Sequence, residues 1–217
     1  SSLLEPDILE GDLIDKWDVI ILPADSKQMM LGPAGSSEGG GPDPSSTPPE
    51  YRSGFGQEGV EALEAFVQAG GTLVTFAEAG DLAIDEFELP VRNAVSGMSG
   101  NEFWAPGSTL KVDVDISSPF AYGMPDRALA TYLANGQVYE TVPGARSSDV
   151  QRVLTYINRD ILQSGWLLGE EAIANKAAVV SVRHGEGIVL LIGFRAQHRA
   201  QTHGTFKLLF NALIENS

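Results

Sequence analysis

The stretch QEGVEALEAFVQAGGTLVTF, residues 57–76, decides the fold of this chain. Its first part, Gln57 to Ala69, spaces apolar side chains at helical intervals and therefore predicts an amphipathic helix. These side chains are Val60, Leu63, Phe66 and Val67. The pair Gly70 and Gly71 can adopt the left-handed conformation that ends a helix. Thr72 to Phe76 is an apolar run of strand length, so a buried strand should follow the helix directly.

A strand is also predicted upstream, at Asp18 to Leu22, where a continuous apolar, β-branched run favours burial on both faces. With residues 57–76 it completes a βαβ unit, in which the two strands are parallel. Residues 32–56, which separate the two parts, are dense in Gly, Pro and Ser and predict a mobile surface loop. Either Ser1 to Pro6 forms a further short strand, or a first strand and helix lie outside this chain. The second case would expose a sheet edge through which two copies could pair.

The middle of the chain predicts shorter strands. Thr109 to Val114 alternates apolar and polar residues, as a half-exposed strand does, and Arg152 to Ile157 is another strand candidate. Leu129 to Leu133 and Gln137 to Val142 flank the dipeptide Asn135-Gly136. Asn-Gly between apolar runs is a strong local signal for a β-hairpin.

The C-terminal part predicts a hairpin and a helix. Ala177 to Val182 and Ile188 to Ile192 are apolar runs joined by the short segment RHGEG. The last helix is predicted by apolar residues at helical spacing, namely Phe206, Leu209, Phe210, Leu213 and Ile214. The order of elements predicts one α/β domain over residues 1–217, with a mostly parallel sheet, helices on its faces and a hairpin near its end.

Composition excludes several classes of function. The net charge is −15, and residues 1–120 hold 21 acidic against 5 basic residues, so the surface should repel nucleic acid. The chain has no cysteine, which excludes disulfides, thiolate zinc sites and a cysteine nucleophile. No apolar run approaches the roughly 18 residues that a membrane span needs, and no signal peptide opens the chain. Because the chain opens at Ser1 and not at Met, we expect a fragment of a longer protein.

Two segments resemble the class I glutamine amidotransferase-like group of flavodoxin-like domains. They are DVIILP, residues 18–23, and GVEALEAFVQAGGTLV, residues 59–74. The resemblance implies a flavodoxin-like three-layer sandwich. In that group a glycine pair precedes the strand that leads to the nucleophile elbow, where a cysteine works with a His and a Glu. Here the strand is followed by AEAG, so Ala77 or Glu78 stands near the nucleophile position and neither Cys nor Ser does.

Three other segments resemble the C-terminal domain of large bacterial zinc carboxypeptidase-like proteins. They are SPFAYGMP (118–125), SGWLLGE (164–170) and GFRAQHRAQTHGTFKLLFN (193–211). That family binds zinc through His-x-x-Glu and a distant His, with a Glu as general base. None of His184, His198 and His203 has a Glu three residues later. The resemblance therefore implies that zinc belongs to a peptidase domain upstream of this chain, and that this chain holds no cofactor. It also implies a location outside the cytoplasm, secreted or periplasmic.

The best candidate for a binding site follows the strand Ile188 to Ile192, because ligands favour the carboxyl ends of strands in α/β sheets. Arg195 and Arg199 could hold a carboxylate there. They are accompanied by His198, Gln201 and His203. Alternatively, both arginines pair with acids of residues 1–120 and fix the last helix. His198 and His203 are too few to bind a metal alone, and His184 should be exposed in its turn.

A second candidate site lies at the elbow, where Glu78 and Asp81 follow the strand Thr72 to Phe76. Asp81 is equally suited to act as the N-cap of a helix running toward Glu88. Elsewhere, three aromatic residues could line a groove for a ligand or serve as anchors that pack loops onto the core. They are Trp104, Tyr122 and Trp166.

These observations favour a non-catalytic accessory domain of a zinc carboxypeptidase-like protein. It would pack against the peptidase domain, shape access to it, or bind a peptide or glycan. A first alternative is a free-standing ligand-binding or interaction protein with a pocket at the strand ends. A second is a hydrolase that uses Glu78 together with the His198 and His203 region.

Overall fold

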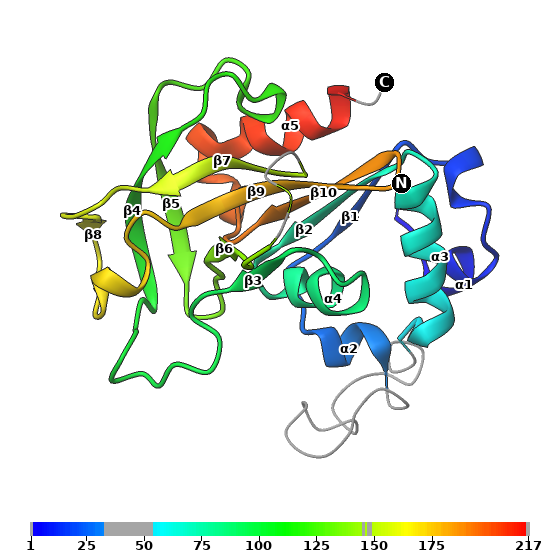
Figure 1. Cartoon of the computed structure of the whole chain (residues 1–217), viewed down its shortest axis with the longest axis horizontal. Helices are drawn as coiled ribbons and strands as arrows, with labels where there is room; N and C mark the ends of the chain where they lie inside the picture. Colours follow the sequence, from blue (N-terminus) through cyan, green and yellow to red (C-terminus); the bar gives the residue numbers. More distant parts are fainter. Residues whose placement is uncertain (1, 33–53, 145, 147–148, 216–217) are drawn as a thin grey trace.

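The computed structural model describes residues 2–32, 54–144, 146 and 149–215 (Figure 1). The helices of this part are α1 (Glu5–Leu9), α2 (Lys27–Leu31), α3 (Gly56–Gln68), α4 (Gly80–Glu86) and α5 (Phe206–Glu215). The strands are β1 (Val19–Leu22), β2 (Thr72–Phe76), β3 (Val91–Asn93), β4 (Gly107–Val114), β5 (Arg127–Leu133), β6 (Tyr139–Thr141), β7 (Val150–Tyr156), β8 (Leu162–Ser164), β9 (Ala177–His184) and β10 (Gly187–Ile192). None of the helices described is long and apolar enough to cross a membrane.

All these strands belong to one sheet, whose main order is β1-β2-β10-β9-β7-β4-β5. Only the β1–β2 and β2–β10 pairs are parallel, and every other pair is antiparallel. The expected mostly parallel sheet is therefore wrong, although the α/β class is right. Parallel neighbours need a long crossover, usually a helix. The described residues between β4 and β10 contain no α-helix, so their strands fold back in antiparallel pairs.

The parallel part of the sheet lies between two layers of helix. Every residue of β2 is buried, and its side chains alternate between two hydrophobic clusters. Leu73 packs with Leu63 of α3, whereas Val74 lies in the cluster of Leu208 and Ala212 from α5. Figure 1 accordingly shows α3 and α5 on different sides of the sheet. The predicted helix, glycine turn and buried strand of residues 57–76 are confirmed.

The antiparallel part of the sheet has one buried and one open face. Along β4, Leu110, Val112 and Val114 are buried, whereas Lys111 and Asp113 between them are not. This confirms the half-exposed strand predicted from the alternation of Thr109 to Val114. The buried face adjoins the same cluster as α5, so the sheet is covered on that side and open on the other.

The hairpin predicted around Asn135-Gly136 is wrong, although the turn itself forms. The Gly136 amide donates to the Leu133 carbonyl at 2.9 Å, but β5 pairs with β4, and β6 pairs with β3 and β9. Two contacts explain why the strands separate. The Tyr132 hydroxyl donates to the Gly136 carbonyl at 2.6 Å, and the Gln137 amide donates to the Gly193 carbonyl at 2.7 Å. The chain after the turn is therefore bound to the end of β10.

The N-terminal part corrects two further expectations. Residues 5–9 form helix α1, so the alternative of a strand at Ser1 to Pro6 is wrong. Strand β1 pairs only with β2 among the described residues and is half open, with Ile21 exposed, so it is not buried on both faces. The predicted mobile loop of residues 32–56 falls almost wholly on residues 33–53, which lie outside the described part. The C-terminal hairpin β9–β10 and the last helix are confirmed.

Candidate functional site

A sharp strand-to-helix turn follows β2. Phe76 ends the strand in an extended conformation, and Ala77 takes a left-handed conformation with φ of 47°. A 3-10 turn, Ala77–Ala79, then leads into α4. A positive φ is uncommon for a residue with a Cβ and persists only where the surroundings impose it. This turn has the geometry by which α/β enzymes present a nucleophile, and it occurs at the position predicted for the elbow.

The elbow presents a methyl group where a nucleophile would stand, because the left-handed residue is Ala77. The next side chain, Glu78, is engaged: its Oε1 accepts a hydrogen bond of 2.5 Å from Nδ2 of Asn135. This bond joins the elbow to the turn that follows β5. Sequence reasoning missed Asn135 as a partner because its Asn-Gly signal favours a hairpin.

The start of α4 packs tightly against a polar layer. A Cβ at Gly80 would lie 2.7 Å from both Gln137 Oε1 and the Tyr139 hydroxyl, so only glycine fits here. The Tyr139 hydroxyl is buried and donates to Gln137 Oε1 at 3.0 Å. Thr75 Oγ1, also next to Gly80, is buried without a partner among the described residues. Residues 135–139 therefore form the rear wall of the elbow.

Asp81 does not cap α4, contrary to the predicted N-cap role. The N-cap residue is Ala79, and Asp81 lies inside the first turn of the helix. Burial is the largest effect on the Asp81 carboxyl and raises its pKa. A hydrogen bond with Gln137 opposes the shift, whereas the nearby carboxylates of Asp85 and Glu78 add to it. Asp81 is thus held in an environment that disfavours its charged form.

A cavity of about 600 Å³ opens beside the elbow, at the carboxyl ends of β1 and β2. Its lining is polar and mostly acidic, and comprises Glu78, Asp81, Asp85 and Glu86 with Lys27, Ser26, Gln28, Ser96 and Leu31. Lys27 Nζ lies 2.6 Å from Glu86 Oε1 and 3.0 Å from Asp85 Oδ2. Burial, the largest single effect, lowers the pKa of Lys27, but its bonds to the two carboxylates outweigh burial and raise the pKa overall.

The described residues contain no cluster of three His, Asp or Glu side chains that could hold a metal ion. The acidic lining of the cavity therefore does not form a metal centre. Ligands in α/β sheets favour the carboxyl ends of strands, and this cavity has that position.

The predicted cluster after β10 lies apart from this cavity, whose lining includes none of its five residues. Arg195 is partly buried and its Nε has no hydrogen-bond partner in the described structure. Arg199 is exposed in a left-handed conformation, and within residues 2–32 and 54–144 neither arginine has an ion pair with an acid. The alternative in which they pair with acids of the first 120 residues is not seen there.

The other polar residues of this cluster do not converge either. Gln201 and His203 are exposed, His198 is partly buried, and the His203 ring packs edge-on against Phe206 at 5.1 Å. The turn is shaped instead by Thr202 and Thr205, whose hydroxyls both donate to the Ala196 carbonyl, at 2.5 and 2.7 Å.

His184 is not simply exposed, contrary to expectation. It ends β9, its Nε2 lies 2.9 Å from Glu64 Oε1 on α3, and its ring stacks on Phe87 with centroids 5.6 Å apart. It fastens the end of the β9–β10 hairpin to α3 and to the end of α4.

The interpretation of three aromatic residues as anchors packed onto the core is wrong. Trp104, Tyr122 and Trp166 are 44%, 79% and 64% exposed. Trp104 and Leu168 form an isolated antiparallel bridge, which places Trp104 on a loop outside the main sheet order. These rings therefore lie on the surface.

No family model matches this chain, and no curated protein matches it. Among solved structures, it is similar to a cytoplasmic protein from Salmonella typhimurium, with a TM-score of 0.53 and 15% identity over 98% of this chain and 78% of that one. A second cytoplasmic protein, from Salmonella typhimurium LT2, gives a TM-score of 0.51 and 11% identity over 93% and 72% of the two chains. A putative GMP synthase protein from Thermoplasma acidophilum gives 0.50 and 10% over 93% and 73%.

At these identities the similarity shows the fold alone. The neighbours are consistent with a glutamine amidotransferase-like fold, in agreement with the elbow after β2. None of the comparisons supports the resemblance to carboxypeptidase-like proteins. The chain thus has an amidotransferase-like α/β fold with an alanine at its elbow.

Proposed function

We propose that this chain is a catalytically silent amidotransferase-like domain that serves as the accessory domain of a larger zinc carboxypeptidase-like protein. It packs against the peptidase domain and shapes access to it. Zinc is expected in that peptidase domain and not in this chain, and the whole protein is expected outside the cytoplasm.

The observation that carries the proposal is the alanine at the elbow. Covalent catalysis at an elbow needs a nucleophile there and a base within hydrogen-bond reach. Ala77 offers neither group, and Glu78 beside it is already bonded to Asn135. No histidine lines the adjoining cavity in the described structure, so the alternative of a hydrolase based on Glu78 lacks a proton-transfer partner.

The accessory role is supported by where the resembling segments lie. Residues 118–125 and 193–211 pack on each other: Asn211 Nδ2 donates to the carbonyls of Phe120 at 2.9 Å and Tyr122 at 3.0 Å. Around this contact Tyr122 is 79% and Phe210 54% exposed. Exposed aromatic side chains near one another are typical of protein–protein contact surfaces. We assign this surface to contact with the peptidase domain.

The first test is the coding sequence upstream of Ser1. An in-frame domain with His-x-x-Glu and a later His is expected, whereas a start codon close to Ser1 would overturn the accessory role. If the domain is present, Phe210→Lys in the full protein should loosen its packing and alter KM for peptide substrates. The exposed, distant Arg183→Lys should change neither.

Catalytic silence has a separate test. The purified chain is offered glutamine and simple esters, and neither should be hydrolysed above background. Hydrolysis that Glu78→Gln abolishes would establish the hydrolase alternative instead.

A free-standing ligand-binding protein remains the second candidate, favoured by the cavity beside the elbow. Four carboxyl groups and one lysine line it, so an organic cation would suit it. Calorimetry with agmatine tests this role: saturable binding that Asp81→Asn weakens supports it, and no heat of binding contradicts it.

A further inference from the structure

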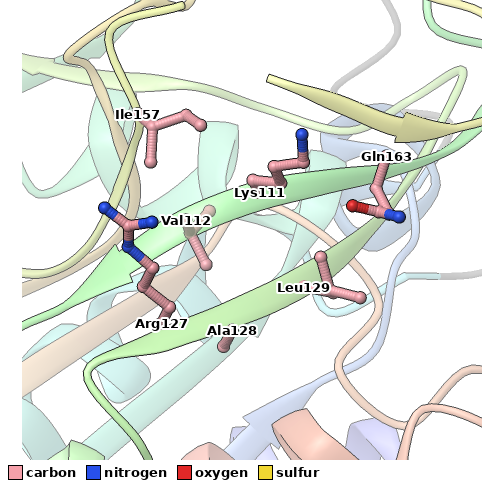
Figure 2. Close-up of a pocket in the computed structure, with 7 residues that line it drawn as sticks. All are labelled: Lys111, Val112, Arg127, Ala128, Leu129, Ile157 and Gln163. Atoms are coloured by element: carbon pink, nitrogen blue, oxygen red, sulfur yellow. The ribbon is translucent and has the colours of Figure 1, made fainter. Parts of the chain in front are cut away.

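A second, smaller pocket lies far from the elbow, on the open face of the antiparallel part of the sheet (Figure 2). Its volume is about 240 Å³, and it lies where β4, β5 and β8 meet the loop after β7. The side chains that matter are Lys111 of β4, Arg127 and Leu129 of β5, Ile157 of the loop and Gln163 of β8. None of them belongs to the elbow cavity.

The register of β4 and β5 puts two cations on this face. Lys111 is opposite Leu129, and Asp113 is opposite Arg127. Side chains that are directly opposite, or two residues along, share one face of a sheet. Lys111 and Arg127 are therefore diagonal neighbours, and Figure 2 shows both side chains on the same side of the two strands. Like charges at this spacing repel, so an anion between them would be stabilised.

Both cations keep hydrogen-bonding capacity. Lys111 Nζ donates to the Asp160 carbonyl at 2.9 Å, which uses one of its three N–H groups. Arg127 Nε lies 3.4 Å from Asp113 Oδ1, with the two side chains 79% and 58% exposed. An exposed pair of this kind is weak, so a carboxylate could compete with Asp113 for the guanidinium.

The charge of this pocket contrasts with that of the whole chain. The net charge is −15, and yet no acidic side chain of the described residues lines the pocket, which has one lysine and one arginine. The remaining wall is apolar: Leu129 is 47% exposed and Ile157 partly buried. The volume is just below the range of about 300–1,000 Å³ usual for drug-sized ligands, so the ligand is small.

We propose that this pocket binds a small carboxylate that carries an apolar chain, with the carboxylate between Lys111 and Arg127 and the chain against Leu129 and Ile157. Gln163 offers an amide to the carboxylate edge. A free branched-chain acid and the last residue of a peptide share this chemistry.

The test uses the whole chain and three probes: 4-methylpentanoate, its neutral isostere 4-methylpentanamide, and N-acetyl-leucine. Two-dimensional NMR should show saturable shifts of the Leu129 and Gln163 amides with the carboxylates, at a Kd on the order of 1 mM. The neutral amide should not bind. Tighter binding of N-acetyl-leucine would identify a peptide C-terminus as the source, and tighter binding of 4-methylpentanoate would identify a free acid.

Variants separate recognition from general charge effects. Lys111→Gln and Arg127→Gln should each weaken binding about fivefold, whereas Arg183→Gln, which removes the same charge from β9, should leave it unchanged. Asp113→Asn removes the competing acid and should tighten binding about twofold. The proposal is overturned if no shift saturates, if the neutral amide binds equally well, or if Asp113→Asn weakens binding.

Discussion

The parallel and antiparallel parts of the sheet are built differently from one chain. In β2 every residue is buried, because α3 and α5 cover both faces of the parallel part. In β4 buried and open residues alternate, because loops connect its neighbours and leave one face to solvent. The type of connection therefore decides how many faces of a strand are buried, and this limits which residues a strand can tolerate.

The two parts also offer opposite sites. The parallel part places its polar groups beyond the strand ends, in an acidic cavity beside the elbow. The antiparallel part places them on the face of the strands, in a basic pocket with an apolar wall. A single acidic domain thus presents one surface suited to cations and another suited to carboxylates.

Core truncation should separate the two parts most clearly. Leu73→Ala in β2 should lower the free energy of unfolding by about 2–5 kcal/mol, because Leu73 is fully buried. Leu129→Ala on the open face of β5 should cost less than about 1 kcal/mol. Urea unfolding of both variants measures the difference. Equal losses would mean that the open face is covered in solution.

The junction between the parts should be the next most sensitive place. A Cβ at Gly193 would collide with the Gln137 carbonyl, so Gly193→Ala should cost about 1–3 kcal/mol. Gly107→Ala at the start of β4 meets nothing within 4 Å and should be close to neutral. Thermal unfolding of the pair is the measurement, and a neutral Gly193→Ala would show that the junction can yield.

The elbow should tolerate a change that an ordinary helix does not. Ala77→Gly relieves a left-handed conformation, which offsets the lost methyl contact and the added freedom of the unfolded chain. We expect a change below about 0.5 kcal/mol, against a loss of about 1 kcal/mol for Ala62→Gly within α3. Denaturant unfolding compares the two. A loss at Ala77 as large as that at Ala62 would show that the elbow stores no strain.

The smallest effect should be the pH dependence contributed by Asp81. Burial raises its folded-state pKa above the ordinary value of 3.8, so its charged form destabilises the fold at higher pH. Asp81→Asn should therefore be more stable than the native chain at neutral pH. The gap should close as pH falls through the raised pKa toward 3.8. Unfolding followed from pH 7 to pH 3 tests this, and a gap that widens on acidification would contradict it.

The parts of the fold that were predicted correctly depend on contacts close in sequence. The α3–β2 unit follows from helical spacing and the glycine pair at Gly70 and Gly71, and the β9–β10 hairpin from two apolar runs and a short turn. The antiparallel order β9-β7-β4-β5 was not predicted, because the partner of a strand is set by packing among distant segments. Asn135-Gly136 illustrates the limit: its local signal predicted the turn and could not predict which strands would pair.

The candidate site was predictable in position and not in composition. The strand-to-helix turn placed Ala77, Glu78 and Asp81 at the elbow from sequence alone. The bond from Asn135 to Glu78 joins residues brought together only by the completed sheet. The same holds for His184, whose partners Glu64 and Phe87 come from two regions earlier in the chain. The pocket at Lys111 and Arg127 required the register of β4 and β5.

The central place of β10 has a consequence for the order in which the molecule forms. Thr72 of β2 pairs with Ile188 of β10, and β10 also joins the parallel part to β9. During synthesis β2 can find β1 early, but its other edge must wait until the C-terminal hairpin has left the ribosome. Contacts this distant in sequence slow folding, and an apolar strand edge left open meanwhile is prone to aggregate. We therefore expect ribosome-bound chains that end before Gly187 to remain protease-sensitive around β2.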